Sequence, residues 1–229
     1  TSGLAANPTL GYVSDKLVGM GATSILSETT ELMGTEDILA ARCIDERVAK
    51  DLLDMIKNNE EHFALAGENI RDGNPSPGNK EGGLTTIEEK SLGCINKAGY
   101  STINEVYGYG EQVDKKGLVV MDTPGQDIAS IAAMVAGGAQ IVIFTTGRGT
   151  PTGNGIVPVI KITGNAETFS LMNDNIDFDA SAIVAGKASI ADTGEKLFEL
   201  MMEVVNGKVS KAEALGFSDM SRARKCKFR

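Results

Sequence analysis

The sequence has no tryptophan, one histidine and only three cysteines in 229 residues. Cys43, Cys94 and Cys226 are far apart and show neither the spacing of a zinc site nor a disulfide framework, which fits a reducing compartment. The single histidine, His62, lies in an acidic and polar stretch, so we expect it on the surface. These shortages argue against structural zinc, disulfide scaffolds and histidine-based catalysis.

Long hydrophobic runs and clustered basic residues are also missing. No apolar run approaches the ~20 residues of a membrane span, and no signal peptide is visible. The 22 Lys and Arg residues are outnumbered by 31 Asp and Glu residues, and the net charge of −9 argues against nonspecific nucleic-acid binding. The basic run 222–229 is expected to be a solvated tail. We therefore expect a cytoplasmic protein that binds neither nucleic acid nor membranes.

Continuous apolar runs separated by helical patterns indicate the fold. The predicted strands lie near residues 23–27, 118–122, 140–145 and 158–163. Helices are predicted between them, including a first helix that starts with Asn7 as its cap and a long amphipathic helix at 45–65, whereas 67–84 is expected to be loop. Apolar strands of this kind are typical of a parallel sheet covered on both faces. The sequence thus predicts an α/β fold, Rossmann-like and three-layered, with one mostly parallel sheet.

The segment 73–93 reads GNPSPGNKEGGLTTIEEKSLG and is the most distinctive motif. A loop stiffened by two prolines runs into a helix start that collects amide, hydroxyl, carboxylate and ammonium groups. An ordinary connection needs no such variety, whereas a site for a small polyhydroxylated anion does. Two overlapping capping-box patterns, Thr85 with Glu88 and Thr86 with Glu89, would by themselves explain about half of this cluster.

Other polar side chains fall at expected strand ends, where ligands bind in open α/β sheets. They are Glu28, Asp122, Thr145 and Thr146. Arg148 follows in a glycine-rich loop, and its guanidinium can bind a carboxylate through two parallel hydrogen bonds.

Two lysine patterns leave alternatives open. Lys161 stands in an otherwise apolar strand, so it lies either on an exposed face or buried and functional, and we favour the second because burial needs a partner. Lys90, Cys94 and Lys97 share one stripe of a helix expected at 85–97. That stripe is either a solvated basic edge or the cationic wall of a pocket.

Two nucleotide-like motifs lack the partners they need. Residues 119–125 imitate the magnesium-side motif of a GTPase, but no segment supplies a P-loop. The glycines at 147–153 imitate a dinucleotide loop, but Pro151 and a strand replace the helix that should meet the pyrophosphate. Both patterns argue against nucleotide chemistry.

Seven motifs together resemble those of a known family. In order they are SGLAANP at 2–8, ILSETTE at 25–31, the 73–93 segment, MDTPG at 121–125, FTTGRG at 144–149, PVIK at 158–161 and DFDA at 177–180. With them the chain resembles the altronate dehydratase / galactarate dehydratase family, lyases of sugar acids from bacteria and archaea. The resemblance covers nearly the whole chain and is weakest after residue 216.

The resemblance implies that residues 1–229 are the C-terminal catalytic portion of such an enzyme, with 1–115 and 116–229 as candidate subregions. In the family a Cys-Gly-Gly-Ser-Asp-like stretch and small N-terminal modules usually precede this region. We therefore expect the chain to be inactive alone and to need the N-terminal portion or a small subunit, and a homo-oligomer is consistent with this. The resemblance also implies a divalent metal, iron(II) first, with Glu28 and Asp122 as candidate ligands and other ligands outside the chain.

Dehydration of a sugar acid requires a base for the α proton, an acid for the departing β-hydroxyl and cations that neutralise the enediolate. We expect catalytic roles for Lys90, Lys161, Arg148 and Glu88. We expect substrate contacts from Asn79, Lys80, Thr85, Thr86, Thr145, Thr146 and Gly147. The alternatives are a carbon–sulfur lyase that acts on sulfolactate, whose relatives share the TIEEKSLG stretch, and a non-catalytic module that binds sugar acids.

Overall fold

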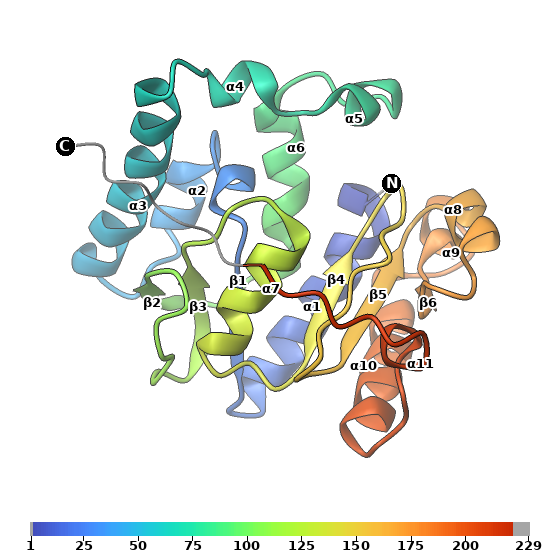
Figure 1. The fold of residues 1–229 in the computed structure, drawn as a ribbon. Coiled ribbons are helices and arrows are strands. Elements are labelled where there is room, and N and C mark those ends of the chain that lie inside the picture. The colour runs from blue at the N-terminus through green and yellow to red at the C-terminus, as the bar shows by residue number, and fades with distance from the viewer. Residues whose placement is uncertain (1, 222–229) are drawn as a thin grey trace.

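Two parallel sheets form the centre of the protein, for which a computed structural model describes residues 2–221 (Figure 1). The first sheet has the order β1-β3-β2, with β1 at Thr23–Leu26, β2 at Ile103–Tyr107 and β3 at Gly117–Met121. The second has the order β4-β5-β6, with β4 at Val142–Thr145, β5 at Val159–Thr163 and β6 at Phe178–Asp179.

The predicted α/β class with parallel strands is confirmed, and all four predicted strands are present as β1, β3, β4 and β5. The prediction of a single sheet is wrong, because β1 and β4 are not hydrogen-bonded to each other. Apolar runs identify strands but carry no information about which strands are neighbours. The sequence also missed β2, which mixes polar and apolar residues at a sheet edge, and β6, which has only two residues.

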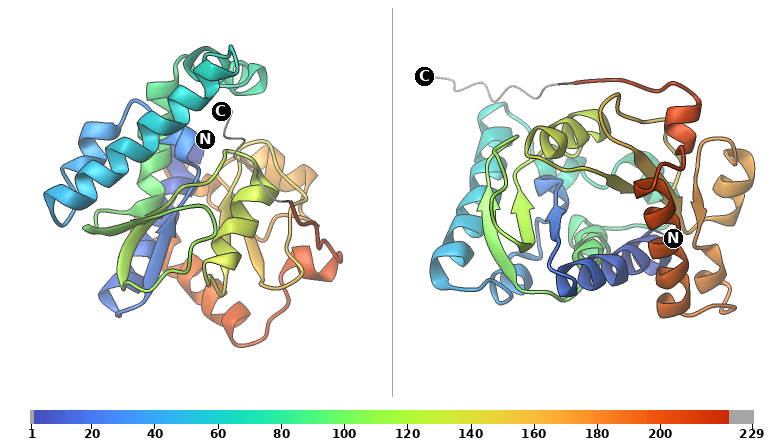
Figure 2. Two further views of the ribbon diagram at one scale, coloured as in Figure 1. Left: turned by 60° about the vertical axis from the view of Figure 1, so that its left-hand side comes forward. Right: turned by 90° about the horizontal axis from the view of Figure 1, so that it is seen from below.

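Helices cover both faces of the sheets. They are α1 (Asn7–Gly19), α2 (Glu36–Ala40), α3 (Glu46–Leu65), α4 (Ile70–Gly73), α5 (Pro77–Glu81), α6 (Ile87–Cys94), α7 (Asp127–Ala136), α8 (Ala166–Leu171), α9 (Ser181–Val184), α10 (Ile190–Val205) and α11 (Lys211–Ala214). The described residues also form a π-helix, η1 (Ser2–Ala6), and two 3₁₀ helices, η2 (Thr29–Glu31) and η3 (Ile95–Ala98). Figure 2 shows the same layers from two further directions.

Successive side chains of a strand point to opposite faces of the sheet, and each face packs against different helices. In β3, Leu118 and Val120 pack with α3, whereas Val119 and Met121 pack with α7. In the second sheet, residues of β5 on one face pack with α1 and α10, and residues of β4 and β5 on the other pack with α7 and α11. Helices α1 and α7 therefore lie on opposite faces, and each packs against both sheets.

Helix starts follow local capping chemistry, with two corrections. Asp45 caps α3 as expected, its carboxylate accepting from Val48 N–H at 2.8 Å. Asn7 is not a cap, because η1 runs directly into α1 and the Asn7 amide donates to the Gly93 carbonyl at 2.9 Å. The stretch 67–84 is not only loop either, since it contains α4 and α5.

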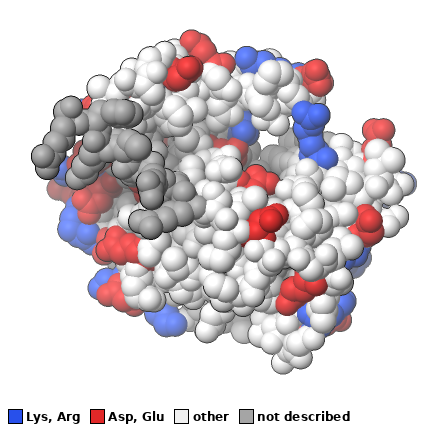
Figure 3. Space-filling model, in the orientation of Figure 1, with Lys and Arg blue, Asp and Glu red and all other residues white. Residues whose placement is uncertain are grey.

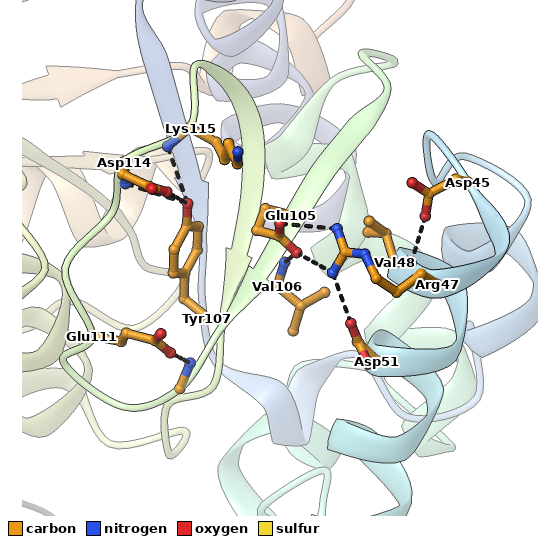
Figure 4. A network of polar contacts seen from close by, with 11 residues as sticks. Asp45, Arg47, Val48, Asp51, Glu105, Val106, Tyr107, Glu111, Asp114 and Lys115 are labelled. Carbon is orange, nitrogen blue, oxygen red and sulfur yellow. Dashed lines mark hydrogen bonds and ion pairs between the residues drawn. The ribbon is translucent and has the colours of Figure 1, made fainter.

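A polar network fastens α3 and the loop after β2 to the first sheet (Figure 4). Arg47 of α3 holds the Glu105 carboxylate with two hydrogen bonds of 2.9 and 3.0 Å. The Tyr107 hydroxyl donates to Asp114 at 2.6 Å and accepts from Lys115 N–H at 3.0 Å. These contacts attach the edge strand β2 to α3 through Glu105 and to the following loop through Tyr107.

Charged side chains are mixed on the surface. On the face drawn in Figure 3, Lys and Arg are interspersed with Asp and Glu rather than gathered in one basic patch. Among the described residues, no helix is long and apolar enough to cross a membrane. The basic run 222–229, with Cys226, lies outside the described residues. The division into subregions 1–115 and 116–229 stays a prediction.

A matched pair of glycines in α1 tests its contact with η3. A methyl group on Gly11 would overlap the Asn96 carbonyl oxygen, whereas one on Gly19 would meet nothing within 4 Å. We expect Gly11→Ala to destabilise the protein by about 1–3 kcal/mol through overpacking against backbone. Gly19→Ala should be neutral or stabilising by up to about 1 kcal/mol. Thermal melts of both variants measure this, and equal melting temperatures would contradict the packing described.

Candidate functional site

Glu28 has an unusual backbone at the carboxyl end of β1. Its φ of 70° and ψ of 66° make it the one non-glycine residue with positive φ among residues 2–221. Such a conformation costs on the order of 1–3 kcal/mol and persists only where surrounding contacts impose it. Here the Glu28 N–H donates to the Thr123 hydroxyl at 2.7 Å, and Thr29 N–H donates to the Thr123 carbonyl at 2.9 Å. The loop after β3 thus holds the turn that carries Glu28.

Four charged side chains form a chain of ion pairs that we call the carboxylate–ammonium ladder: Glu28, Lys97, Glu31 and Lys90. Lys97 Nζ lies 2.6 Å from Glu28 Oε2 and 3.9 Å from Glu31 Oε2. Lys90 Nζ lies 2.6 Å from Glu31 Oε1. All four side chains are only 12–17% exposed, so these pairs are largely shielded from water. Two carboxylates and two ammonium groups leave the ladder neutral.

The lysine stripe on α6 and η3 is therefore the wall of an interior polar site rather than a solvated edge. Cys94, which lies between the two lysines in sequence, donates its thiol to Glu31 Oε2 at 2.8 Å. Lys90 also donates to the Asn74 amide oxygen at 2.9 Å, which connects the ladder to the proline-rich loop. In Figure 3 the surface is hollowed beneath the segment that carries α4 and α5.

Burial and charge separate the two carboxyl groups. Burial raises the pKa of Glu28, although Lys97 opposes this. Burial also acts on Glu31, but Lys97 and Lys90 together outweigh it and hold the Glu31 pKa below its usual value. Lys97 lies between the two carboxylates, and their charges raise its pKa despite burial. A pair of carboxyl groups whose pKa values are pushed apart in this way is typical of an acid and a permanent anion.

Cys94 is buried and unreactive in this setting. Burial, together with the nearby Glu31 charge, raises the pKa of its thiol well above the usual range. The thiol therefore stays protonated and acts as a hydrogen-bond donor rather than a nucleophile.

Arg148 reaches α5 from the loop after β4. Its guanidinium lies directly against Gly78, where any side chain would overlap it. The 145–149 loop and the 73–83 segment, which we placed at one site, are thus in contact. Thr145 ends β4 and lines the same cavity as Glu28 and Lys97. Thr146 accepts from Gly149 N–H at 2.9 Å, and the Gly147 carbonyl accepts from Thr168 at 2.9 Å.

The start of α6 uses its hydroxyl groups for capping. Thr86 accepts from Glu89 N–H at 3.2 Å, and Thr85 donates both its N–H and its hydroxyl to the Glu89 carboxylate, at 2.8 and 2.6 Å. Glu88 is exposed and accepts from Arg71 at 3.3 Å instead of closing a box with Thr85. These contacts satisfy the polar groups of the helix start without a ligand.

The remaining predicted contacts lie apart from the ladder. Asn79 and Lys80 are on α5, where Asn79 N–H donates to Ser76 at 3.4 Å and Lys80 is exposed. Lys161 is fully buried on β5, with its ammonium 3.3 Å from the Pro151 carbonyl and 5.6 Å from the Phe217 ring centre. Burial lowers its pKa, despite some opposition from Asp177. The structure brings Lys90 to the ladder but does not place Lys161 against it.

A metal site does not form from the residues that we expected. Among residues 2–221, no three Asp, Glu, Cys or His side chains gather as ligands. Glu28 is occupied by Lys97, and Asp122 accepts hydrogen bonds from Thr29 at 2.8 Å and Asn59 at 2.9 Å. These groups on their own do not fit a divalent ion.

Lys97 and Glu31 were not among the site residues chosen from the sequence. A signal for them was present, because Glu28 and Glu31 are three residues apart after a strand, and Lys90 and Lys97 lie on one helical stripe. Neither pattern alone shows that two acidic and two basic groups from distant segments meet in the interior.

The family model described as D-galactarate/Altronate dehydratase, C-terminal, matches residues 1–227. The chain is 40% identical to the altronate dehydratase of Escherichia coli K12 over 220 residues, which are 96% of this chain and 44% of that protein. It is 42% identical to the galactarate dehydratase (L-threo-forming) of the same organism, over 90% of this chain and 39% of that protein.

A third relative is named for a different activity. The (2R)-sulfolactate sulfo-lyase subunit beta of Chromohalobacter salexigens is 35% identical over 98% of this chain and 58% of that subunit. The chain thus spans less than half the length of the two dehydratases and somewhat more than half of this subunit.

Removal of one ammonium group tests the ladder. Lys97→Met leaves the buried Glu28 without its partner, and we expect a loss of about 3–5 kcal/mol of folding free energy. For a chain of this size that corresponds to a drop of roughly 6–20 °C in Tm. The double variant Glu28→Gln/Lys97→Met should lose less, because no charge is left unpaired. As a control, Lys50→Met removes an exposed ion pair with Asp54 and should leave the Tm almost unchanged. A Tm of Lys97→Met equal to that of the Lys50→Met control would contradict the buried ion pair between Lys97 and Glu28.

Proposed function

The chain belongs to the D-galactarate/altronate dehydratase family, as its C-terminal region, and we propose that it supplies acid–base residues to an enzyme that removes water from a sugar acid. The observation that carries the proposal is the ladder at the end of β1, where a strained Glu28 with a raised pKa lies beside an ionised Glu31. The product would be a 2-keto-3-deoxy acid.

The reaction needs two proton transfers and one anion site. The α proton leaves first, and the adjacent carboxylate becomes a dianionic enediolate that cations must stabilise. The β-hydroxyl then departs with a proton from an acid, as water. Glu28 suits the acid because burial raises the pKa of its carboxyl group. Lys90 suits the fixed cation because its ammonium group is held 2.6 Å from Glu31 Oε1 in a largely buried ion pair.

Arg148 suits the substrate carboxylate. Its guanidinium is exposed, lies at the contact between the 145–149 loop and α5, and can bind a carboxylate in a planar fork. Lys161 suits the role of the base that removes the α proton, because burial lowers its pKa and so favours the neutral amine. Its amine lies beneath Pro151 and Phe217, so this role requires the 145–154 loop to open when substrate binds. Thr145 and Thr146 are nearby hydroxyl donors for the substrate.

The complete enzyme would contain more than this chain. We propose a cytoplasmic enzyme in which an N-terminal portion or small subunit completes the site, with assembly as a homo-oligomer. A divalent ion, iron(II) in our proposal, would then take its ligands mainly from that other part. No step assigned to the residues above depends on the ion.

Steady-state assays of the complete enzyme with iron(II) test the proposal. The substrates are altronate, galactarate and sulfolactate, and the products are the keto-deoxy acid or sulfite. Turnover of a sugar acid supports the proposal, and sulfite release from sulfolactate would assign the chain to the sulfo-lyase branch. Binding of a sugar acid without turnover in the complete enzyme would favour the non-catalytic module.

Arg148→Lys separates charge from geometry. The variant keeps a cation but loses the fork, so kcat/KM on a sugar acid should fall about 10- to 100-fold, with KM rising. As a control, Arg47→Lys alters a guanidinium that also holds a carboxylate, that of Glu105, through two hydrogen bonds. Arg47 is not part of the proposed site, so this variant should leave kcat/KM unchanged. Equal activity of the two variants would remove Arg148 from the site.

Lys161→Met tests the proposed base with little change in shape. We expect a rate loss of ~10²–10⁴ with an unchanged melt. In the wild type the rate should fall as pH drops through the lowered lysine pKa, because only the neutral amine accepts a proton, and the variant should lose this dependence. Glu88→Gln should stay near wild type, since Glu88 is exposed and pairs with Arg71. A large loss in Glu88→Gln together with an active Lys161→Met would reverse these roles.

A further inference from the structure

The two sheets present unpaired edges to each other. Within residues 2–221, β1 pairs only with β3, and β4 pairs only with β5. A cavity of about 580 Å³ lies between these edges and is lined by β1 and β4 along their whole length. Helix α1 closes one side of this cavity with Leu10, Val13 and Leu17, and α7 closes the other with Ser130 and Met134. We call this space the inter-sheet slot.

Backbone groups of both strands point into the inter-sheet slot. Gly117 N–H donates to the Ala22 carbonyl, and groups alternate along a parallel strand, so the Ile25 amide faces away from β3. In the same way Val142 N–H donates to Pro158 of the neighbouring strand, so the Ile143 and Thr145 amides face away from β5. Unpaired amides inside a helix-covered layer are costly unless a partner satisfies them.

The slot has the shape of one missing strand. Strands in a sheet are about 4.8 Å apart, so one strand between β1 and β4 would satisfy both edges at once. With α1 and α7 on the two faces, the space admits a single extended layer rather than a helix. Most of its lining is apolar, and polar groups such as Glu28, Lys97 and Thr145 gather where the strands end.

Chain connections agree with a strand at this position. Helix α7 connects β3 to β4 and so passes over β1 and the slot. Helix α1 leads into β1, and in a right-handed βαβ unit such a helix follows a parallel strand in the same sheet. A strand before α1 would end at the N-terminus of η1, which Figure 1 shows near the upper end of β4. The place next to β1 is the one that such a strand would take.

We propose that the inter-sheet slot is filled by a short apolar β-strand from the part of the enzyme that precedes this region. The family description calls the matched region C-terminal, and the dehydratase relatives are more than twice its length, so they contain such a part. The strand lies parallel to β1 and β4 and joins the two sheets into one. The carboxyl end of the strand then lies beside the carboxylate–ammonium ladder, which makes the site a joint product of both parts.

Proline substitution in the complete enzyme tests whether β1 is interior. Proline is tolerated where an amide of an edge strand faces outward, but not inside a sheet. We expect Ile25→Pro to be as damaging in thermal melts as Ser24→Pro, whose amide faces β3, whereas Ile25→Ala measures the side-chain loss alone. An Ile25→Pro variant that melts like Ile25→Ala would show that β1 is an edge and would overturn the proposal.

Photo-crosslinking identifies the occupant in the wild-type enzyme. Met134, Met201 and Met202 line the slot, so photo-methionine incorporation places probes there without a designed mutation. We expect a crosslink from Met134 to a peptide N-terminal to residue 1 of the same chain, and its loss in Met134→Leu, whereas a crosslink to a separate subunit would overturn the proposal. Crosslinks only within residues 2–221, or to a second copy of this region, would overturn the proposal. Neither outcome depends on which substrate the enzyme turns over.

Discussion

The pairing of Lys97 with two buried carboxylates is the interaction on which the rest of the site depends. An unpaired charge at this depth would cost several kcal/mol, so each member fixes the others. Lys97 comes from η3, Glu28 from the end of β1 and Glu31 from η2, and the ladder therefore joins segments about 70 residues apart in sequence. Their mutual requirement explains why a strained residue is tolerated at position 28: the turn directs its carboxylate inward.

The same pairing gives the two carboxyl groups different chemistry. Glu31 has two ammonium neighbours and stays ionised, whereas Glu28 shares one of them and is more affected by burial. A site that must both stabilise an anion and donate a proton needs this asymmetry. Lys90 contributes to this difference, since it pairs with Glu31 whereas Lys97 contacts both carboxylates.

The sequence predicted the elements better than their arrangement. Apolar runs located β1, β3, β4 and β5, and Asp45 marked the start of α3, because these signals are local. The division into two sheets was missed, since strand order depends on pairing between distant segments. In the site, Lys90 and Glu28 were chosen and meet as parts of one ladder, but Lys97 was not chosen, because a lysine three residues after a cysteine on a short helix has no local mark of burial. The many polar residues of 73–93 suggested a larger contribution to the site than the structure shows, since Thr85, Thr86 and Glu89 cap the start of α6.

The failure of the single-sheet prediction and the incomplete site have a common physical cause. Parallel sheets are normally covered on both faces, and β1 and β4 are edge strands that lie between α1 and α7. Their open edges end beside Glu28, Lys97 and Thr145, and the described residues form no cluster of His, Cys, Asp and Glu side chains that could hold a metal ion. A segment that satisfied the backbone in the inter-sheet slot would have its carboxyl end beside these side chains. Completion of the sheet and completion of the active site would then be the same event.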